Sequence, residues 1–239
     1  MKLTRKDYEK RQHELTQLYR KCWPELNREL ASFSTLRSLS RPFLLDLTAH
    51  NFPEAQSKLL VVGQQTNGWD TDHATGGDLV DDLLWLYKDF EMGANYVRSP
   101  FWAGTHELYG RLNIDGPATG FAWTNVLKVD EANGRPQPDV VDVLFRSFNL
   151  LSEEIRLAQP DVVVFFTGPT YDDFLKRIFG GIIFHETSAA SGRLLVRLEY
   201  DRSVLPHHTY RTYHPKGLRL HNHWNLIEII SRWSRLGVA

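Results

Sequence analysis

Four short apolar segments stand out along the chain, and each ends in a polar segment that carries Gly or Pro. The segments are 58–62 (KLLVV), 121–126 (FAWTNV), 161–166 (DVVVFF) and 209–213 (TYRTY). The third is a continuous apolar run, which is typical of a strand buried on both faces, and the second and fourth are rich in β-branched and aromatic residues. The pattern therefore predicts four strands.

Helical spacing of apolar residues fills the segments between these strands. The expected helices span 4–22, 24–30, 140–157, 171–178 and 222–236. Pro24 is expected to start the second of them, because proline is favoured in the first helical turn. Residues 182–200 predict an additional hairpin. Strands that alternate with helices favour a largely parallel sheet with helices on both faces, and such sheets bind ligands beyond the carboxyl ends of their strands.

Composition narrows the class of protein. A chain of 239 residues suits one large domain, and we expect a helical extension at 1–42 packed on an α/β domain at 43–239, with an acidic insert at about 70–95. The single cysteine excludes an internal disulfide, a four-cysteine zinc site and a cysteine-held iron–sulfur cluster. We expect no metal and no cofactor. No apolar run is long enough for a membrane helix, and the first residues are too polar for a secretory signal, so we expect a cytoplasmic protein without a membrane partner. We also expect a monomer.

The net charge of -1 hides an uneven distribution. Residues 1–42 carry +5 and residues 201–239 carry +4, whereas residues 43–200 carry -10. This pattern has two interpretations. The charges could be chance clusters on solvated helix faces, or two basic segments could meet around an anionic ligand, because phosphate contacts depend on local charge.

Residues that could bind a ligand or take part in catalysis lie at the ends of the first and fourth strands. The first ends in 63–69 (GQQTNGW), whose glycine spacing is similar to that of a phosphate loop but lacks the Gly-Lys-Ser/Thr ending, so a nucleoside triphosphate site is disfavoured. A structural turn is the alternative. The fourth strand is followed by His214 and Pro215, which place a histidine at a rigid turn. Such a histidine is either structural or catalytic.

Two further segments add an amide and a pair of aromatic rings. Asn125 in the second strand segment can give one donor and one acceptor to a flat heterocycle, although asparagine is also a common turn-former. The third strand is followed by Thr167–Thr170, which predicts a tight turn into a helix. Phe101 and Trp102 follow a proline, and they form either part of the core or a platform on which a base stacks.

Taken in order, five motifs resemble those of the uracil-DNA glycosylase superfamily, and most closely its iron–sulfur-containing bacterial and archaeal branch. The motifs are VVGQQTNGW (61–69), SPFWAGTHELYGRL (99–112), TNVLKVDEANGRPQP (124–138), QPDVVVFFTGPT (159–170) and YHPKGLR (213–219). The resemblance covers roughly 58–235. It implies an α/β fold, a three-layer α/β/α sandwich around a four-stranded parallel sheet. It also implies base flipping from DNA into a pocket.

The resemblance also implies roles for individual residues. Phe101 would stack on the base, Asn125 would hydrogen-bond its edge, and His214 would donate to a base carbonyl as negative charge develops. The remaining base-binding candidates are Gly63 and Gln64. The remaining catalytic candidates are Gln65 and Asn67, and the candidates for contact with the DNA backbone are Lys216, Arg219 and Thr170.

The chain departs from the family in three places. It lacks the four cysteines of the iron–sulfur branch, so helix packing by 1–31 is expected to replace the cluster. Its insert is acidic, with one lysine among the acids Asp70, Asp72, Asp78, Asp81, Asp82, Asp89 and Glu91. Gln65 lies where several branches place Asp, Glu or Asn to orient water, and an amide supplies no negative charge to an oxocarbenium-like transition state. Asn67, Asp70 or Asp72 are the possible substitutes.

Three functions remain open from the sequence. The leading hypothesis is a glycosylase-like protein that hydrolyses the N-glycosidic bond of uracil or another damaged base in DNA. The second is a catalytically silent protein of the same fold that binds DNA, a nucleobase or a protein partner. The third is hydrolysis of a free nucleoside or nucleotide.

Overall fold

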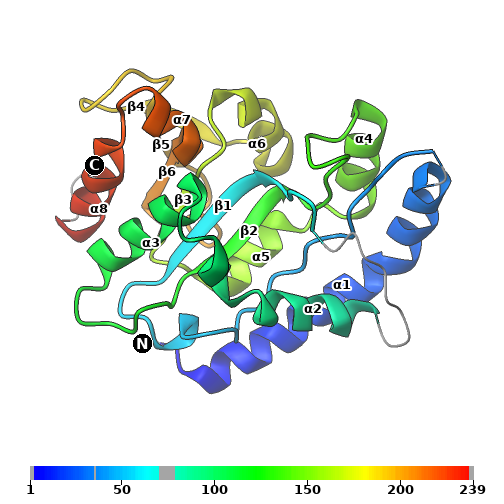
Figure 1. The fold of residues 1–239 in the computed structure, drawn as a ribbon. Coiled ribbons are helices and arrows are strands. Elements are labelled where there is room, and N and C mark those ends of the chain that lie inside the picture. Colours follow the sequence, from blue (N-terminus) through cyan, green and yellow to red (C-terminus); the bar gives the residue numbers. More distant parts are fainter. Residues whose placement is uncertain (1–2, 35, 70–78, 237–239) are drawn as a thin grey trace.

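The computed structural model describes residues 3–34, 36–69 and 79–236. Its strands are β1 (Leu59–Gln65), β2 (Ala122–Leu127), β3 (Val162–Phe165), β4 (Ile183–Glu186), β5 (Leu195–Glu199) and β6 (His208–Thr212). They form one six-stranded sheet in the order β2-β1-β3-β6-β5-β4 (Figure 1). β2, β1, β3 and β6 run parallel to one another, and β5 and β4 are antiparallel to their neighbours.

The predicted α/β class is confirmed, whereas the predicted four-stranded parallel sheet differs from the sheet observed. The hairpin expected at 182–200 forms as β4 and β5, and β5 pairs with β6. Because the hairpin joins the main sheet at this edge, the sheet is mixed and has six strands.

The helices lie on both faces of this sheet. They are α1 (Arg5–Ser34), α2 (Leu79–Asp89), α3 (Pro100–Leu112), α4 (Pro138–Ser147), α5 (Leu151–Ala158), α6 (Asp172–Phe179), α7 (Pro215–Leu220) and α8 (Asn225–Leu236), with short 3-10 helices η1 (Phe52–Glu54), η2 (Glu91–Tyr96) and η3 (Pro169–Tyr171). None of the helices in these described ranges has both the length and the apolar character needed to cross a membrane.

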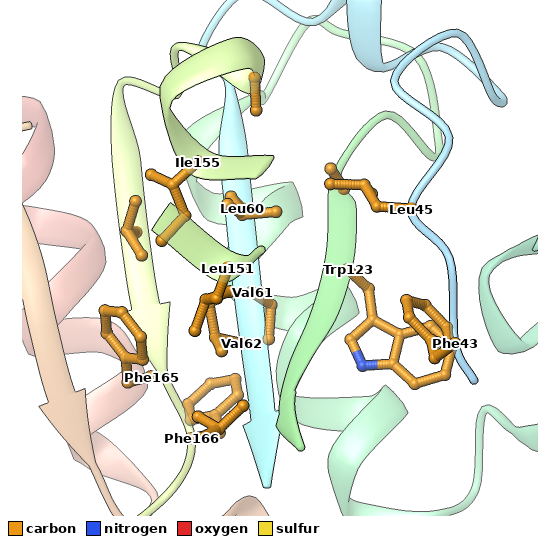
Figure 2. Packing of buried hydrophobic residues seen from close by; sticks show 14 of the residues in the cluster. Phe43, Leu45, Leu60, Val61, Val62, Trp123, Leu151, Ile155, Phe165 and Phe166 are labelled. Atoms are coloured by element: carbon orange, nitrogen blue, oxygen red, sulfur yellow. The ribbon is translucent and has the colours of Figure 1, made fainter. Parts of the chain in front are cut away.

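Side-chain alternation along β2 shows which helices cover which face. Trp123 packs against Trp102 of α3, with ring centroids 4.9 Å apart, whereas the next residue, Thr124, hydrogen-bonds Glu154 of α5. Successive side chains of a strand point to opposite faces, so α3 and α5 cover opposite faces. Figure 2 shows core residues from both faces, with Leu151 of α5 beside β1 and with Trp123 beside Phe43.

The first helix differs from the prediction, because α1 continues through Pro24 where two helices were expected. The residues that α1 buries lie both before and after the proline. They are Tyr8, Leu15, Tyr19, Leu26 and Leu30. A proline inside a helix removes one backbone hydrogen bond, and burial of this shared apolar stripe offsets the loss.

The helix expected at 140–157 is two helices, because the chain breaks at Phe148 between α4 and α5. Phe148 leaves the helical region with φ -146° and stacks on Tyr19 of α1 at 5.9 Å. Packing of this ring against α1 therefore accompanies the break. The periodic apolar pattern continues through the break, so it gave no signal of it.

A buried polar network ties α1 and α5 to β2. The Tyr19 hydroxyl donates to one carboxylate oxygen of Glu154 at 2.7 Å, and Thr124 donates to the other at 2.8 Å. The ammonium of Lys128 pairs with Glu154, and both side chains are almost fully buried. Burial lowers the pKa of Lys128, while Glu154 acts in the opposite direction. The N-terminal helix is thus joined to the strand that carries Asn125.

Candidate functional site

A cavity of about 560 Å³ lies at the carboxyl end of β1, beside Trp123 and Asn125 of β2, where the chain leaves β6. It is lined by 63–69, Phe90, Tyr96, 99–102, Trp123, Asn125, His214 and Lys216. The ends of parallel strands are the usual place for ligands in α/β folds. The cavity gathers these candidates from the sequence: Gly63, Gln64, Gln65, Asn67, Phe101, Asn125, His214 and Lys216.

Aromatic rings form much of the cavity wall. They are Trp69, Phe90, Tyr96, Phe101, Trp102 and Trp123. Trp102 is buried and Phe101 is half-buried, so this pair serves the core and the cavity together. Phe90 comes from the insert and Tyr96 directly follows it; their rings stack at 5.5 Å, and neither residue was identified from the sequence. The segment was interpreted by its acidic residues, so its aromatic rings were not considered as site residues.

His214 is a neutral hydrogen-bond donor at the cavity. It caps α7, where its Nδ1 accepts from the backbone N–H of Lys216 at 3.2 Å. Burial, and then the charge of Lys216, lower the pKa of His214 to about 4. A neutral imidazole whose Nδ1 accepts carries its proton on Nε2. His214 therefore offers an N–H without a positive charge near pH 7.

Asn125 contributes a second donor. The residue is 1% exposed, and its Nδ2 has no hydrogen-bond partner among the described residues. A buried donor without a partner costs about 1–3 kcal/mol, so an acceptor would be favourable there. Nδ2 has less than 1 Å² of exposed surface, so a ligand would reach it after a small movement of the amide or of the residues around it. The amide has room because Gly63 lies beside it: a Cβ at residue 63 would be 2.3 Å from Asn125 Oδ1.

The two glutamines after Gly63 are both held by hydrogen bonds. Gln64 Nε2 donates to the carbonyl oxygen of Thr167 at 2.8 Å. The hydroxyl of Tyr171 donates to Gln65 Oε1. Sequence reasoning missed Tyr171, since the 106 positions that separate it from Gln65 leave no local pattern.

The loop after β1 is held in place by Asp130, which the sequence also did not reveal. The Asp130 carboxylate accepts from the backbone N–H groups of Gly68 at 2.9 Å and Asn133 at 3.0 Å. The loop therefore has a defined shape, with Asn67 exposed. None of the described residues that line the cavity is an acid.

Two of the candidates for DNA-backbone contact lie away from the cavity lining. Arg219 lies over the ring of Trp224, 4.9 Å from its centroid, and lines a separate open hollow of about 620 Å³. Thr170 is exposed, and its hydroxyl accepts from Arg135 at 3.5 Å. Lys216 is exposed and lines the cavity.

Several basic side chains of the N-terminal segment are engaged in ion pairs with the rest of the protein. Arg5 pairs with Glu54 at 2.6 Å, and Arg20 pairs with Asp81 at 2.8 Å. Acidic partners thus neutralise part of the positive charge that the sequence assigned to this end. Other acids of the insert, at 70, 72 and 78, lie outside the described residues.

No group of three or more His, Cys, Asp or Glu side chains within the described ranges could hold a metal ion. Comparison with models of known protein families and with curated proteins finds no match for this chain.

Proposed function

We propose that the cavity binds a nucleobase rotated out of DNA, and that the protein is a DNA base glycosylase-like hydrolase acting on uracil or another damaged base. One observation carries the proposal: the neutral His214, the unpartnered amide of Asn125 and the ring of Phe101 line the same cavity. Its volume of about 560 Å³ falls in the range of small-ligand sites.

Each of these groups has a distinct task in the proposed reaction. Phe101 stacks on the base, and Asn125 donates from Nδ2 to an acceptor on the base edge. As the N-glycosidic bond breaks, its electron pair moves onto the base, and negative charge develops on a carbonyl oxygen. The Nε2–H of His214 stabilises that charge by hydrogen bonding, a kind of contact worth about 3–4 kcal/mol in enzymes.

The architecture supports the proposed membership of the uracil-DNA glycosylase superfamily. Four adjacent strands of the sheet are parallel, helices cover both faces, and the cavity lies at the carboxyl end of β1, beside β2, with His214 just after β6. These features agree with the three-layer sandwich that the motif resemblance implies. The added hairpin of β4 and β5 lies at the opposite edge of the sheet from β2.

A second candidate function is binding of the flipped base without hydrolysis. It is favoured by the lack of an acid among the described lining residues and by the engagement of Gln65 with Tyr171. Hydrolysis needs a water molecule positioned to attack the sugar, and a carboxylate is the usual group to orient that water and stabilise the positive sugar. If hydrolysis occurs, we expect it to be slow.

The test is release of free base from single- and double-stranded oligonucleotides that carry uracil, hypoxanthine or xanthine. We expect release by the wild-type protein and at least a tenfold lower rate with His214→Ala or Asn125→Ala. Tyr109→Phe is the matched control, because the buried Tyr109 hydroxyl has no described partner and lies outside the cavity lining.

Binding measured on the same oligonucleotides separates the two candidates. Tight binding to a damaged base without release, weakened by Asn125→Ala, would favour the silent base-binding protein. If the protein neither binds any of the three substrates nor releases a base from them, both candidate functions are overturned.

A further inference from the structure

Arg135, Tyr171 and Gln65 form a chain of hydrogen bonds that ends at the cavity. Arg135 Nε donates to the Tyr171 hydroxyl at 3.3 Å, and its guanidinium lies over the same ring, 4.3 Å from the centroid. The Tyr171 hydroxyl then donates to Gln65 Oε1. Gln65 is a lining residue of the cavity.

The chain has a defined direction because Arg135 can only donate. The Tyr171 oxygen accepts from Arg135, which leaves its own hydrogen to be donated to Gln65. Tyr171 is fully buried, so the reversed amide, with Gln65 Nε2 facing the hydroxyl, would leave that buried hydrogen without an acceptor. Gln65 therefore holds its oxygen toward Tyr171.

The other half of the Gln65 amide is available to a ligand. No described residue accepts a hydrogen bond from Nε2, and this nitrogen is not among the buried atoms that lack partners. Since Gln65 lines the cavity, Nε2 is a donor that a bound molecule can reach. His214 and Asn125, whose Nδ2 is buried in the wall, belong to the same cavity lining as Gln65.

We propose that Gln65 is a specificity-determining residue that donates to an exocyclic oxygen of the bound base, and that Tyr171 and Arg135 are positioning residues that fix this polarity. The inference rests on the proposed function, because it takes the ligand to be a base. An exocyclic amine at the same place would set two donors against each other, so the site rejects it.

The test compares single-stranded oligonucleotides with one 2′-fluoroarabino-uridine or one 2′-fluoroarabino-cytidine at the same position. The fluorine withdraws electrons from the sugar and suppresses cleavage, so the affinity is measured without turnover. We expect the wild-type protein to bind the uridine oligonucleotide at least tenfold more tightly than the cytidine one.

Three variants then test the positioning chain. In Tyr171→Phe the side-chain amide of Gln65 is free to rotate so that Oε1 and Nε2 exchange places. We expect the ratio of the two affinities to fall to about threefold or less. Arg135→Met should lower the ratio in the same direction, while Tyr109→Phe should leave it unchanged. Thermal unfolding of each variant reports folding separately from selectivity.

The outcomes distinguish this inference from the proposed function. An unchanged ratio in Tyr171→Phe, or an equal decrease of both affinities, would show a merely structural role and overturn the inference. Binding by the wild-type protein without discrimination would also overturn it and leave the proposed function standing. If neither oligonucleotide binds, both proposals fail.

Discussion

The ring of Phe101 lies nearly parallel to the imidazole of His214, with 5.5 Å between the ring centroids and 25° between the planes. Phe101 is in α3 and His214 caps the start of α7, and these two helices pack against each other. The contact buries one side of His214, and burial is the main reason that its pKa falls to about 4.

The low pKa of His214 predicts a pH-dependent contribution to stability. An unfolded histidine has a pKa of about 6.5, so between that value and about 4 the unfolded chain binds the proton more readily. This contribution is present above the unfolded pKa and is lost as the pH falls through the folded pKa. Compared with His214→Gln, the wild-type protein should lose on the order of 1–2 kcal/mol more stability between pH 7.5 and 5.

Urea unfolding of both proteins at these two pH values measures the difference. Equal losses in the wild-type protein and the variant would contradict a neutral buried His214. Other histidines with lowered pKa values, such as His50 and His106, contribute equally to both proteins and cancel in the comparison.

Gly63→Ala should damage ligand binding by crowding the amide of Asn125. The added Cβ would lie 2.3 Å from Asn125 Oδ1 and 3.5 Å from the ring of Phe101, so the amide must move. We expect at least a tenfold weaker affinity for a uracil-containing oligonucleotide, measured by fluorescence anisotropy.

Gly110→Ala is the matched control, because a Cβ at this position of α3 meets nothing within 4 Å. It should keep the affinity and raise the unfolding free energy by about 0.5–1 kcal/mol, since alanine favours a helix interior. A wild-type affinity in Gly63→Ala would show that the Asn125 amide does not need its present position.

The pairing of Lys128 with Glu154 should show strong coupling in a double-mutant cycle. Lys128→Met leaves a buried carboxylate without its cation, which costs about 3–5 kcal/mol. In the double variant Lys128→Met/Glu154→Leu both charges are gone, so its destabilisation should be smaller than the sum of the two single effects. Chemical denaturation measures all four proteins. Additive effects would mean that the two groups do not interact.

Lys216 and Arg219 should differ from the paired arginines of α1 in their effect on DNA affinity. Removing one phosphate contact should reduce the slope of log affinity against log salt by about 0.9 for duplex DNA. We expect this change for Lys216→Ala and Arg219→Ala. Arg20→Ala serves as the control, since Arg20 forms an ion pair with Asp81. A flat response to salt in the wild-type protein would exclude a DNA partner.

The strands of the parallel part of the sheet could be predicted because they are short buried runs. Val162, Val163 and Val164 are at most 2% exposed. A short run of successive β-branched residues that is followed by a glycine turn favours a buried strand. The continuation of α1 through Pro24 could not be predicted, because local propensity favours the start of a helix at a proline. Only packing against residues distant in the sequence offsets the backbone hydrogen bond that the proline removes.

The candidate site was predictable only in part for a similar reason. His214 and Asn125 belong to motifs in or just after strands, and Phe101 follows a proline at the start of a helix, so all three signals are local in the sequence. Tyr171 reaches Gln65 across 106 positions, and the contact depends on the side-by-side pairing of β1 and β3. The pattern of a single sequence does not indicate which strands pair with each other.

The network around Glu154 also bears on how the chain can be shortened. Tyr19 of α1 donates to a carboxylate that Thr124 also contacts, and Thr124 is the immediate neighbour of Asn125. Deleting the first helix would open this carboxylate and its lysine to water directly behind the amide proposed to hold the base. The N-terminal helix therefore supports the strand that carries Asn125 in the cavity. A fragment that begins after this helix would be an unsuitable substitute for the whole chain in a binding assay.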